Sequence, residues 1–98
     1  MKTIHRFKIG FGCTEINIHG LAEKGIQVPF KDQILKIDVI RGIPSIWCLV
    51  DTDIPEEPHR LMTYGTGWPV GADVSAKDYV GSFIFSEYGE IYHVFLEE

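Results

Sequence analysis

Residues 34–51, ILKIDVIRGIPSIWCLVD, decide the fold, because they predict two neighbouring strands and the turn between them. In the first half, apolar side chains alternate with Lys36 and Asp38, which is the period-two pattern of a strand with one wet face. The other face is expected to carry Leu35, Ile37 and Val39.

The turn and the second strand follow from the rest of this stretch. Gly42 tolerates backbone angles that other residues avoid, and Pro44 restricts Ile43 to extended conformations. In SIWCLV (45–50) both faces are apolar, so this strand is predicted to lie centrally and to be covered on two sides. Its faces are expected to carry Ile46, Cys48 and Val50 on one side and Trp47 and Leu49 on the other.

The same alternation predicts five further strands. The last two are joined by EYGE (87–90) and form a hairpin with aromatic pairs across it. One strand is expected to carry Tyr79, Phe83 and Phe85 on a single face, and its partner Ile91, His93 and Phe95. The five strands are expected at residues 3–9, 14–18, 60–64, 79–86 and 90–96.

The connecting segments complete the prediction. DTDIPEEPH (51–59) combines four carboxylates with two prolines, and we expect an exposed, self-repelling loop there rather than a central strand. GLAEKG (20–25) and VGADVSAKD (70–78) are each expected to hold one short helical turn at most. The sequence therefore predicts a mainly β fold, a single antiparallel β domain over residues 1–98 with about six or seven strands, built as a sandwich or a partly open barrel.

The charge balance limits the partners. Lys and Arg number 9 against 14 Asp and Glu, a formal net charge of -5, and the basic residues are scattered along the chain. This balance opposes duplex nucleic acid, whose binding depends on neutralising phosphates. The longest apolar run, Ile46–Val50, is far shorter than the roughly 20 residues of a membrane-spanning helix. With no secretory pattern in the first residues, a cytoplasmic location without membrane contact is expected.

The stretch YGTGWPV (64–70) is the main candidate for a site. Glycine-rich loops hold phosphates when a helix begins directly after them, but Trp68-Pro69 follows here, so we favour glycines that only turn the backbone. The alternative stays open, because Tyr64 and Trp68 offer aromatic faces beside backbone N–H groups, as a stacked base requires. The candidate ligand-binding residues are Tyr64, Gly65, Thr66, Gly67, Trp68 and Arg60, the last for a negative charge.

No catalytic constellation, metal site or cofactor motif is predicted. Cys48 lies in the most apolar run, where burial disfavours the thiolate, and Cys13 has no visible activator. The chain is therefore predicted not to be an enzyme. A zinc site is not predicted either, because the histidines and cysteines lack the short spacing of a zinc half-site. These residues are His5, His19, His59, His93, Cys13 and Cys48.

Three stretches, ILKIDVIRGIPSIWCLVD, YGTGWPV and YVGSFIFSEYGEIYHVF, resemble a family of small uncharacterised proteins encoded by bacteriophages and prophages. The resemblance runs nearly end to end and departs in a longer region after Gly12, through LAEKGIQVPF. It implies a phage-derived, cytoplasmic single-domain protein and brings no catalytic residue or substrate. The matching positions are Trp47, Tyr64, Gly65, Thr66, Gly67, Pro69, His93, Val94 and Phe95.

Two functions remain in view. The first is a non-catalytic binding module that acts on a host protein, including as an inhibitor of a host pathway or defence system. The alternative is a protein that binds or sequesters a nucleotide-like small molecule with the YGTGWPV loop. A homo-oligomer would favour the nucleotide-binding alternative, because a domain this small has little room for an internal pocket and a site between subunits is easier to build.

Overall fold

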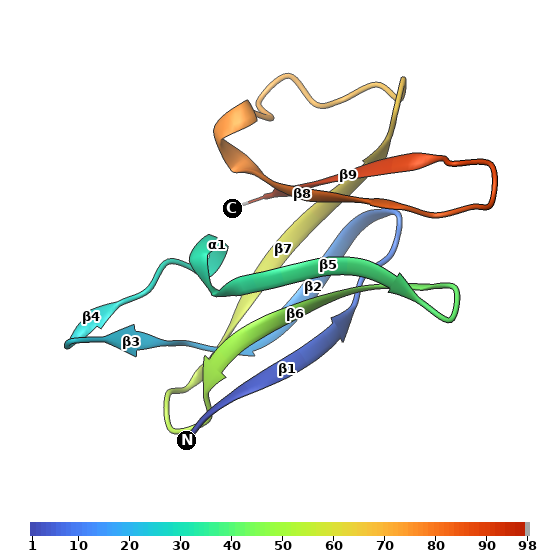
Figure 1. Ribbon diagram of the computed structural model, residues 1–98. Helices are drawn as coiled ribbons and strands as arrows, with labels where there is room; N and C mark the ends of the chain where they lie inside the picture. The colour runs from blue at the N-terminus through green and yellow to red at the C-terminus, as the bar shows by residue number, and fades with distance from the viewer. Residues whose placement is uncertain (98) are drawn as a thin grey trace.

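The computed structural model describes residues 1–97 as two antiparallel sheets packed face to face, with a short hairpin projecting from one end (Figure 1). The mainly β prediction is confirmed, and the two sheets form a sandwich rather than a closed barrel. The three-stranded sheet has the order β1 (Lys2–Lys8), β6 (Ile43–Asp51), β5 (Ile34–Ile40). The four-stranded sheet has the order β2 (Gly12–His19), β7 (Glu56–Gly65), β9 (Ile91–Leu96), β8 (Tyr79–Ile84).

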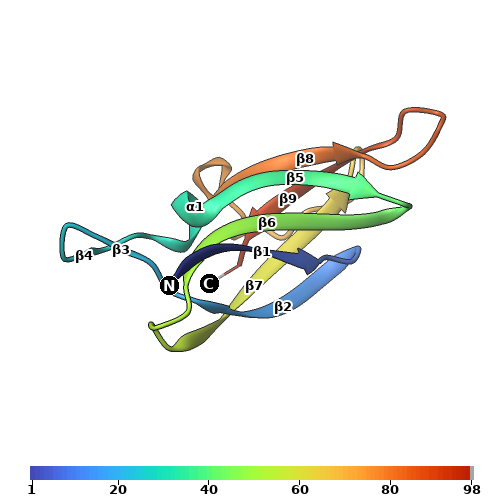
Figure 2. The same ribbon diagram turned by 60° about the horizontal axis from the view of Figure 1, so that its bottom comes forward.

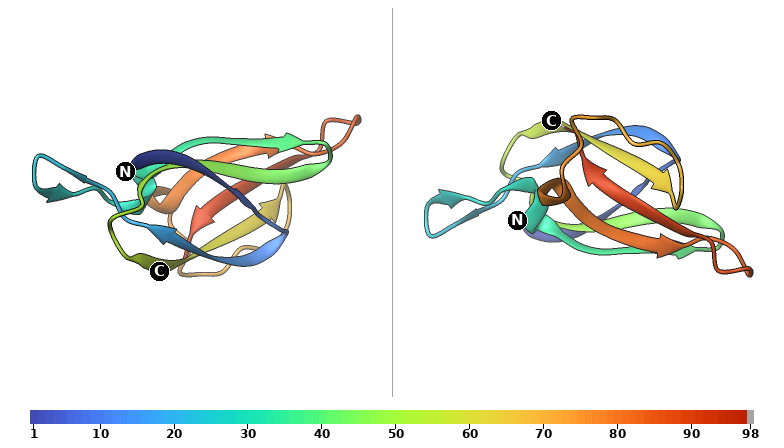
Figure 3. Two further views of the ribbon diagram at one scale, coloured as in Figure 1. Left: turned by 90° about the horizontal axis from the view of Figure 1, so that it is seen from below. Right: turned by 90° about the horizontal axis from the view of Figure 1, so that it is seen from above.

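The smaller elements lie at the margins of the sandwich. The projecting hairpin and the turn of the β8–β9 hairpin extend from opposite ends of the molecule (Figures 2 and 3). No helix among residues 1–97 has the length and hydrophobicity needed to cross a bilayer. The smaller elements are β3 (Ala22–Glu23), β4 (Ile26–Gln27), the helical turn α1 (Phe30–Gln33) and the 3₁₀ turn η1 (Ala76–Asp78).

The β5–β6 hairpin forms as predicted. Its two-residue turn places Arg41 at φ 53° and Gly42 at φ 77°, the double positive φ of a turn whose twist matches that of the strands. β6 is the central strand of its sheet. Its inner residues are fully buried, but Trp47 and Leu49 are only half-buried, so β6 is completely covered on one side alone.

The core lies between the two sheets. β6 contributes Ile46, Cys48 and Val50, which pack against Leu61 and Val94 of the opposite sheet, all with no exposed surface. At one edge β5 and β8 run side by side, so that a Cβ atom on Gly81 would lie 2.9 Å from Ile37 Cδ1. Glycine at this position lets the two sheets approach.

A second link between the sheets is polar. Gln33, at the end of α1, is buried, and its Nε2 donates to His19 O and to Leu49 O, both at 3.0 Å. These carbonyls belong to β2 and β6, one in each sheet. α1, which the sequence did not predict, therefore joins the two layers.

Two bulges change the predicted alternation. In β5 the register shifts between Ile34 and Lys36, so Leu35 is exposed, whereas Ile37 and Val39 are half-buried and pack against the core. In β8 the register shifts between Tyr79 and Gly81. Tyr79 pairs with Phe95, but Phe83 pairs with Tyr92 and therefore does not lie on the same face of the sheet as His93. An extra residue on one strand is not visible in a strictly alternating pattern.

Two connecting segments also differ from expectation. Segment 20–25 forms part of the β3–β4 hairpin instead of a helical turn, because Lys24 (φ 52°) and Gly25 (φ 76°) make the same kind of turn as Arg41 and Gly42. Segment 51–59 is only partly loop, since β6 continues to Asp51 and β7 begins at Glu56. Pro58 is tolerated in β7 because β9 pairs only with Leu61–Gly65, so the Pro58 end has a single neighbour.

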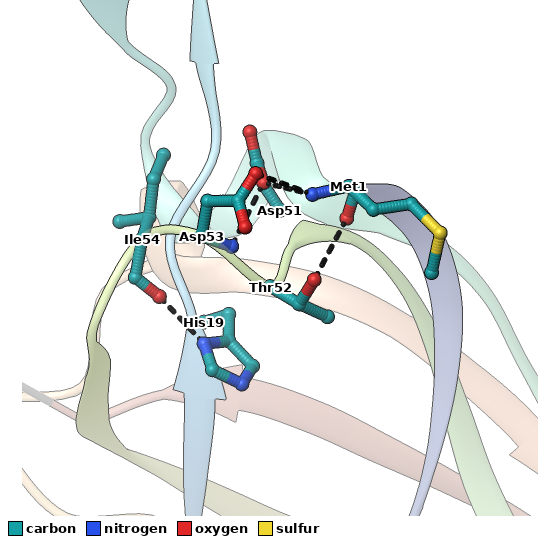
Figure 4. A network of polar contacts seen from close by, with 6 residues as sticks. All are labelled: Met1, His19, Asp51, Thr52, Asp53 and Ile54. Carbon is teal, nitrogen blue, oxygen red and sulfur yellow. Dashed lines mark hydrogen bonds and ion pairs between the residues drawn. The ribbon is translucent and has the colours of Figure 1, made fainter.

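The turn between β6 and β7 is ordered by polar contacts (Figure 4). The Met1 amino group lies 2.9 Å from Asp51 Oδ1 and 2.7 Å from Asp53 Oδ2, and Asp53 N–H donates to Asp51 Oδ1. The pKa of Asp51 is lowered, mainly by the hydrogen bond from the Met1 amino group and next by the one from Asp53 N–H. The turn is held together by these charges rather than spread apart by repulsion between its carboxylates.

Thr63 offers a test of the core. Its Oγ1 is buried and has no hydrogen-bond partner among the described residues. Because a desolvated hydroxyl without a partner costs free energy, Thr63→Val should raise the free energy of unfolding by about 1 kcal/mol. Chemical denaturation measures this change, and Thr63→Ala, which leaves a cavity instead, is the control. A loss of stability in Thr63→Val equal to that in Thr63→Ala would contradict the assignment.

Candidate functional site

The glycine loop after β7 is a tight turn. Trp68 N–H donates to Gly65 O at 3.0 Å, and Gly67 has φ 88°, a left-handed conformation that favours glycine. No helix starts after the turn, since the next helical element is η1 at Ala76–Asp78. The loop therefore lacks the helix N-terminus on which phosphate-binding loops depend.

Thr66 fixes this loop to β9. Its N–H and its hydroxyl both donate to Ile91 O, at 3.2 and 3.1 Å, and Oγ1 lies 2.8 Å from His93 Nε2. Since the hydroxyl hydrogen is directed to Ile91 O, we assign Nε2–H of His93 as donor to Oγ1. This hydrogen bond gives the half-buried His93 a side-chain partner.

Gly65 and Trp68 fit together closely. A Cβ atom on Gly65 would lie 2.7 Å from Cε2 and from Nε1 of the Trp68 ring. The indole also makes an edge-on contact with Tyr92, with ring centroids 5.7 Å apart. Glycine at position 65 is thus required by the packing of Trp68, not by its backbone angles.

A shallow pocket of about 260 Å³ lies beside this turn. Glu90 is the charged residue of its lining, and its carboxylate accepts a hydrogen bond from Tyr92 OH at 3.2 Å. A carboxylate without a neighbouring cation disfavours a phosphate group. The lining residues are Gly65, Thr66, Trp68, Glu90, Ile91 and Tyr92.

The structure brings together only part of the predicted ligand-binding set. Gly65, Thr66, Gly67 and Trp68 form one turn, but Tyr64 faces the outer side of the sheet, 6.0 Å from the Phe95 ring. Arg60 lies five residues before Gly65 in β7, about 17 Å along the strand. Its guanidinium lies 3.7 Å from Cys13 Sγ and 3.7 Å from Glu97 Oε1, away from the pocket.

Segment 66–78 crosses the outer side of the four-stranded sheet and leaves two shallow hollows there. One, of about 360 Å³, is mostly apolar, and the other, of about 220 Å³, carries three carboxylates. Neither hollow was predicted from the sequence, although the apolar residues Val70 and Val74 in this otherwise polar segment indicated that the segment covers part of the sheet. The hollows are lined by Val70, Val74, Ser75, Ala76, Tyr79 and Phe95, and by Tyr64, Asp73, Val74, Asp78, Leu96 and Glu97, respectively.

Large apolar side chains are exposed around the β8–β9 turn. Ile84 and Ile91 are register partners at the last pair of the hairpin, Tyr88 lies in its turn, and Trp68 lines a pocket with Ile91. Their exposed fractions are 62% and 42% for the two isoleucines, 86% for Tyr88 and 47% for Trp68. We call Trp68, Ile84, Tyr88 and Ile91 the hairpin end. The sequence signal was a tyrosine inside the turn EYGE.

Among residues 1–97, no group of three or more His, Cys, Asp and Glu side chains is placed to hold a metal ion. Cys13 is exposed beside Arg60, whereas Cys48 is fully buried. Burial raises the pKa of the Cys48 thiol to about 12. At neutral pH Cys48 is a protonated core residue rather than a nucleophile.

The fold and the site define a small β-sandwich whose strand-end loops and outer faces carry its exposed aromatic and apolar groups, without a catalytic constellation among the described residues. A family model for a domain of unknown function, DUF7352, matches residues 1–98. The chain belongs to this family. No curated protein matches the chain, and no solved structure does.

The fit between Gly65 and Trp68 predicts the effect of one methyl group. Gly65→Ala should displace the indole and lower the free energy of unfolding by about 1–3 kcal/mol, because the added Cβ has no room. Tryptophan fluorescence reports the displacement in a background where Trp47 is replaced by Phe, and denaturant titration reports the stability. Gly67→Ala, which meets no atom within 4 Å but is strained at φ 88°, is the control: it should lose stability without moving the indole emission. Unchanged emission in Gly65→Ala would contradict the packing.

The thiol of Cys48 predicts a pH dependence. In the unfolded chain it ionises near a pKa of about 8.5, but in the fold its pKa is about 12. Its contribution to stability is therefore complete below pH of about 8.5 and lost as the pH rises toward 12, by about 1.4 kcal/mol per pH unit. Urea titrations at several alkaline pH values should show a steeper loss in the parent than in Cys48→Ala. An equal loss of stability per pH unit in the parent and in Cys48→Ala would contradict this role of the Cys48 thiol.

Proposed function

We propose that this protein is a non-catalytic binding module that recognises another protein through its hairpin end. The observation that carries the proposal is the exposure of four large side chains: Ile84, Tyr88 and Ile91 belong to the β8–β9 hairpin and its turn, and Trp68 lines a pocket with Ile91. Contiguous exposed apolar side chains rimmed by polar ones are typical of protein-binding surfaces. Tryptophan and tyrosine are also the residues that most often dominate the energy of such contacts.

The chemistry of the rim indicates the kind of partner. Glu87 and Glu90 are exposed next to Tyr88 and Ile91, and the chain carries a formal net charge of -5. Charge complementarity favours a partner that offers an apolar surface with lysines or arginines around it, because opposite charges speed encounter and exclude wrong partners. The aromatic anchor Trp68 is held in place by Gly65 and Tyr92, so little side-chain entropy is lost on binding.

Among residues 1–97 we identify no activated nucleophile, which supports a role without catalysis. With the Thr66 hydroxyl donating to Ile91 O and His93 Nε2–H assigned as the donor to Thr66 Oγ1, His93 is not placed to act as a base toward Thr66. The buried thiol of Cys48 is protonated.

The finer form of this proposal makes the partner a host protein and the chain a phage accessory protein in the host cytoplasm, including an inhibitor of a host pathway or defence system. The resemblance carried by Trp47, the YGTGWPV loop and the closing strand supports this form. It rests on that resemblance rather than on any geometry.

The second candidate is a module that binds or sequesters a nucleotide-like ligand. The pocket of about 260 Å³ beside Trp68 supports it, and a homo-oligomer would deepen such a site. We rank it second because Glu90 lines the pocket and Arg60 is far from it.

A photocrosslinking residue placed at Tyr88 tests the proposal. It should crosslink a discrete protein in host lysate, whereas the same residue at Ile26, which is 72% exposed at the other end, should not. The purified partner should then bind Ile84→Glu and Tyr88→Glu at least about tenfold more weakly than the parent, with Ile26→Glu unchanged. Equal crosslinking from both positions, or equal affinity of all variants, would sink the proposal. A nucleotide-dependent rise in Tm that is lost in Trp68→Ala but kept in Tyr88→Glu would instead favour the second candidate.

A further inference from the structure

The outer face of the three-stranded sheet is basic, although the whole chain is acidic. Residues of β1, β6 and β5 that alternate with the buried ones point away from the core. We call this surface the basic face. It gathers four cations, Lys2, Arg6, Lys8 and Lys36, against two carboxylates, Asp38 and Asp51, on a chain whose formal net charge is -5.

Strand pairing places an aromatic ring at the centre of this face. Arg6 is the register partner of Trp47 on one side, and Lys36 is its partner on the other. Directly opposed residues in neighbouring strands have Cβ atoms about 5 Å apart. The half-buried indole therefore lies between two cationic side chains, both of which are exposed.

These cations are largely available to a ligand. Arg6 Nε donates to the hydroxyl of Ser45 at 3.1 Å, which positions the guanidinium over β6 without neutralising it. Lys36 Nζ lies 3.6 Å from Asp38 Oδ2, but both side chains are about half exposed, and exposed pairs of this kind are weak. Among residues 1–97, Lys8 has no carboxylate within ion-pair distance.

The bulge in β5 enlarges the face. The register shift between Ile34 and Lys36 leaves both Leu35 and Lys36 exposed beside Trp47. Ile4, which is 56% exposed, pairs with Leu49 next to the ring. The result is a row of apolar surface with cations along its sides.

We propose that the basic face binds single-stranded nucleic acid, with a base stacked at Trp47 and phosphates held by Arg6, Lys8 and Lys36. Proteins that bind single strands combine cationic side chains along the backbone with aromatic rings on which bases stack. A duplex hides its base faces, so it offers no base to stack on Trp47, and its affinity depends largely on phosphate contacts, which the acidic remainder of this chain opposes. An acidic peptide would use the cations but has no group that requires the ring between them. The proposal involves no residue of the hairpin end and stands apart from the proposed function.

Fluorescence anisotropy with labelled oligothymidylate and oligouridylate of about 15 nucleotides tests this. Binding is expected at roughly 20 mM salt, with a slope of log K against log salt of about -2 if three phosphates are contacted. Lys8→Gln with Lys36→Gln should weaken binding by at least about tenfold and reduce the slope by about 1.4. Lys24→Gln with Lys77→Gln, exposed lysines elsewhere, is the matched control and should bind as the parent does.

The stacking step has its own readout. In Trp68→Phe, whose remaining tryptophan is Trp47, oligonucleotide should quench the emission. No quenching despite binding would overturn the role of Trp47. No binding at roughly 20 mM salt, equal weakening in the control pair, or equal affinity for a DNA duplex would overturn the whole proposal. Polyglutamate that competes as strongly as the oligonucleotides would assign the face to an acidic protein segment instead.

Discussion

The contact on which the rest of the structure depends is the burial of Ile46, Cys48 and Val50 of β6 against Leu61 and Val94 of the opposite sheet. In so small a chain, the layer between the two sheets is the main place where apolar surface can be removed from water. Because side chains alternate along a strand, burying one parity of β6 sends the other parity outward. The core thereby determines which residues remain on the outer faces.

The hollows of this fold lie on its outside. The interior of a two-layer sandwich is filled by its own side chains, and the hollows found among residues 1–97 are shallow and lie at strand ends, under segment 66–78 or along the edge where β5 meets β8. The two glycines of the YGTGWPV loop illustrate this. Gly67 permits the turn and Gly65 makes room for Trp68, so both glycines hold an indole at the surface.

The sequence predicted the features that depend on neighbouring residues and missed those that depend on distant ones. Alternation located both long hairpins, and Gly42 located a turn, because these signals are local. The bulge at Leu35 was hidden, since nothing in ILKIDVI marks an extra residue. Tyr64 and Arg60 were grouped with the loop by proximity in the chain, yet strand geometry turns Tyr64 to the outer face and moves Arg60 along β7.

The basic residues also form a surface that their positions along the sequence do not reveal. In the sequence they are scattered, and the net charge of -5 describes an acidic protein. Strand pairing nevertheless brings Arg6 and Lys36, which are 30 positions apart, to either side of Trp47. A ligand within a Debye length of about 8–10 Å responds to these nearby groups more than to the total charge. Net charge therefore limits long-range attraction, whereas the register of β1, β6 and β5 determines what this face can hold.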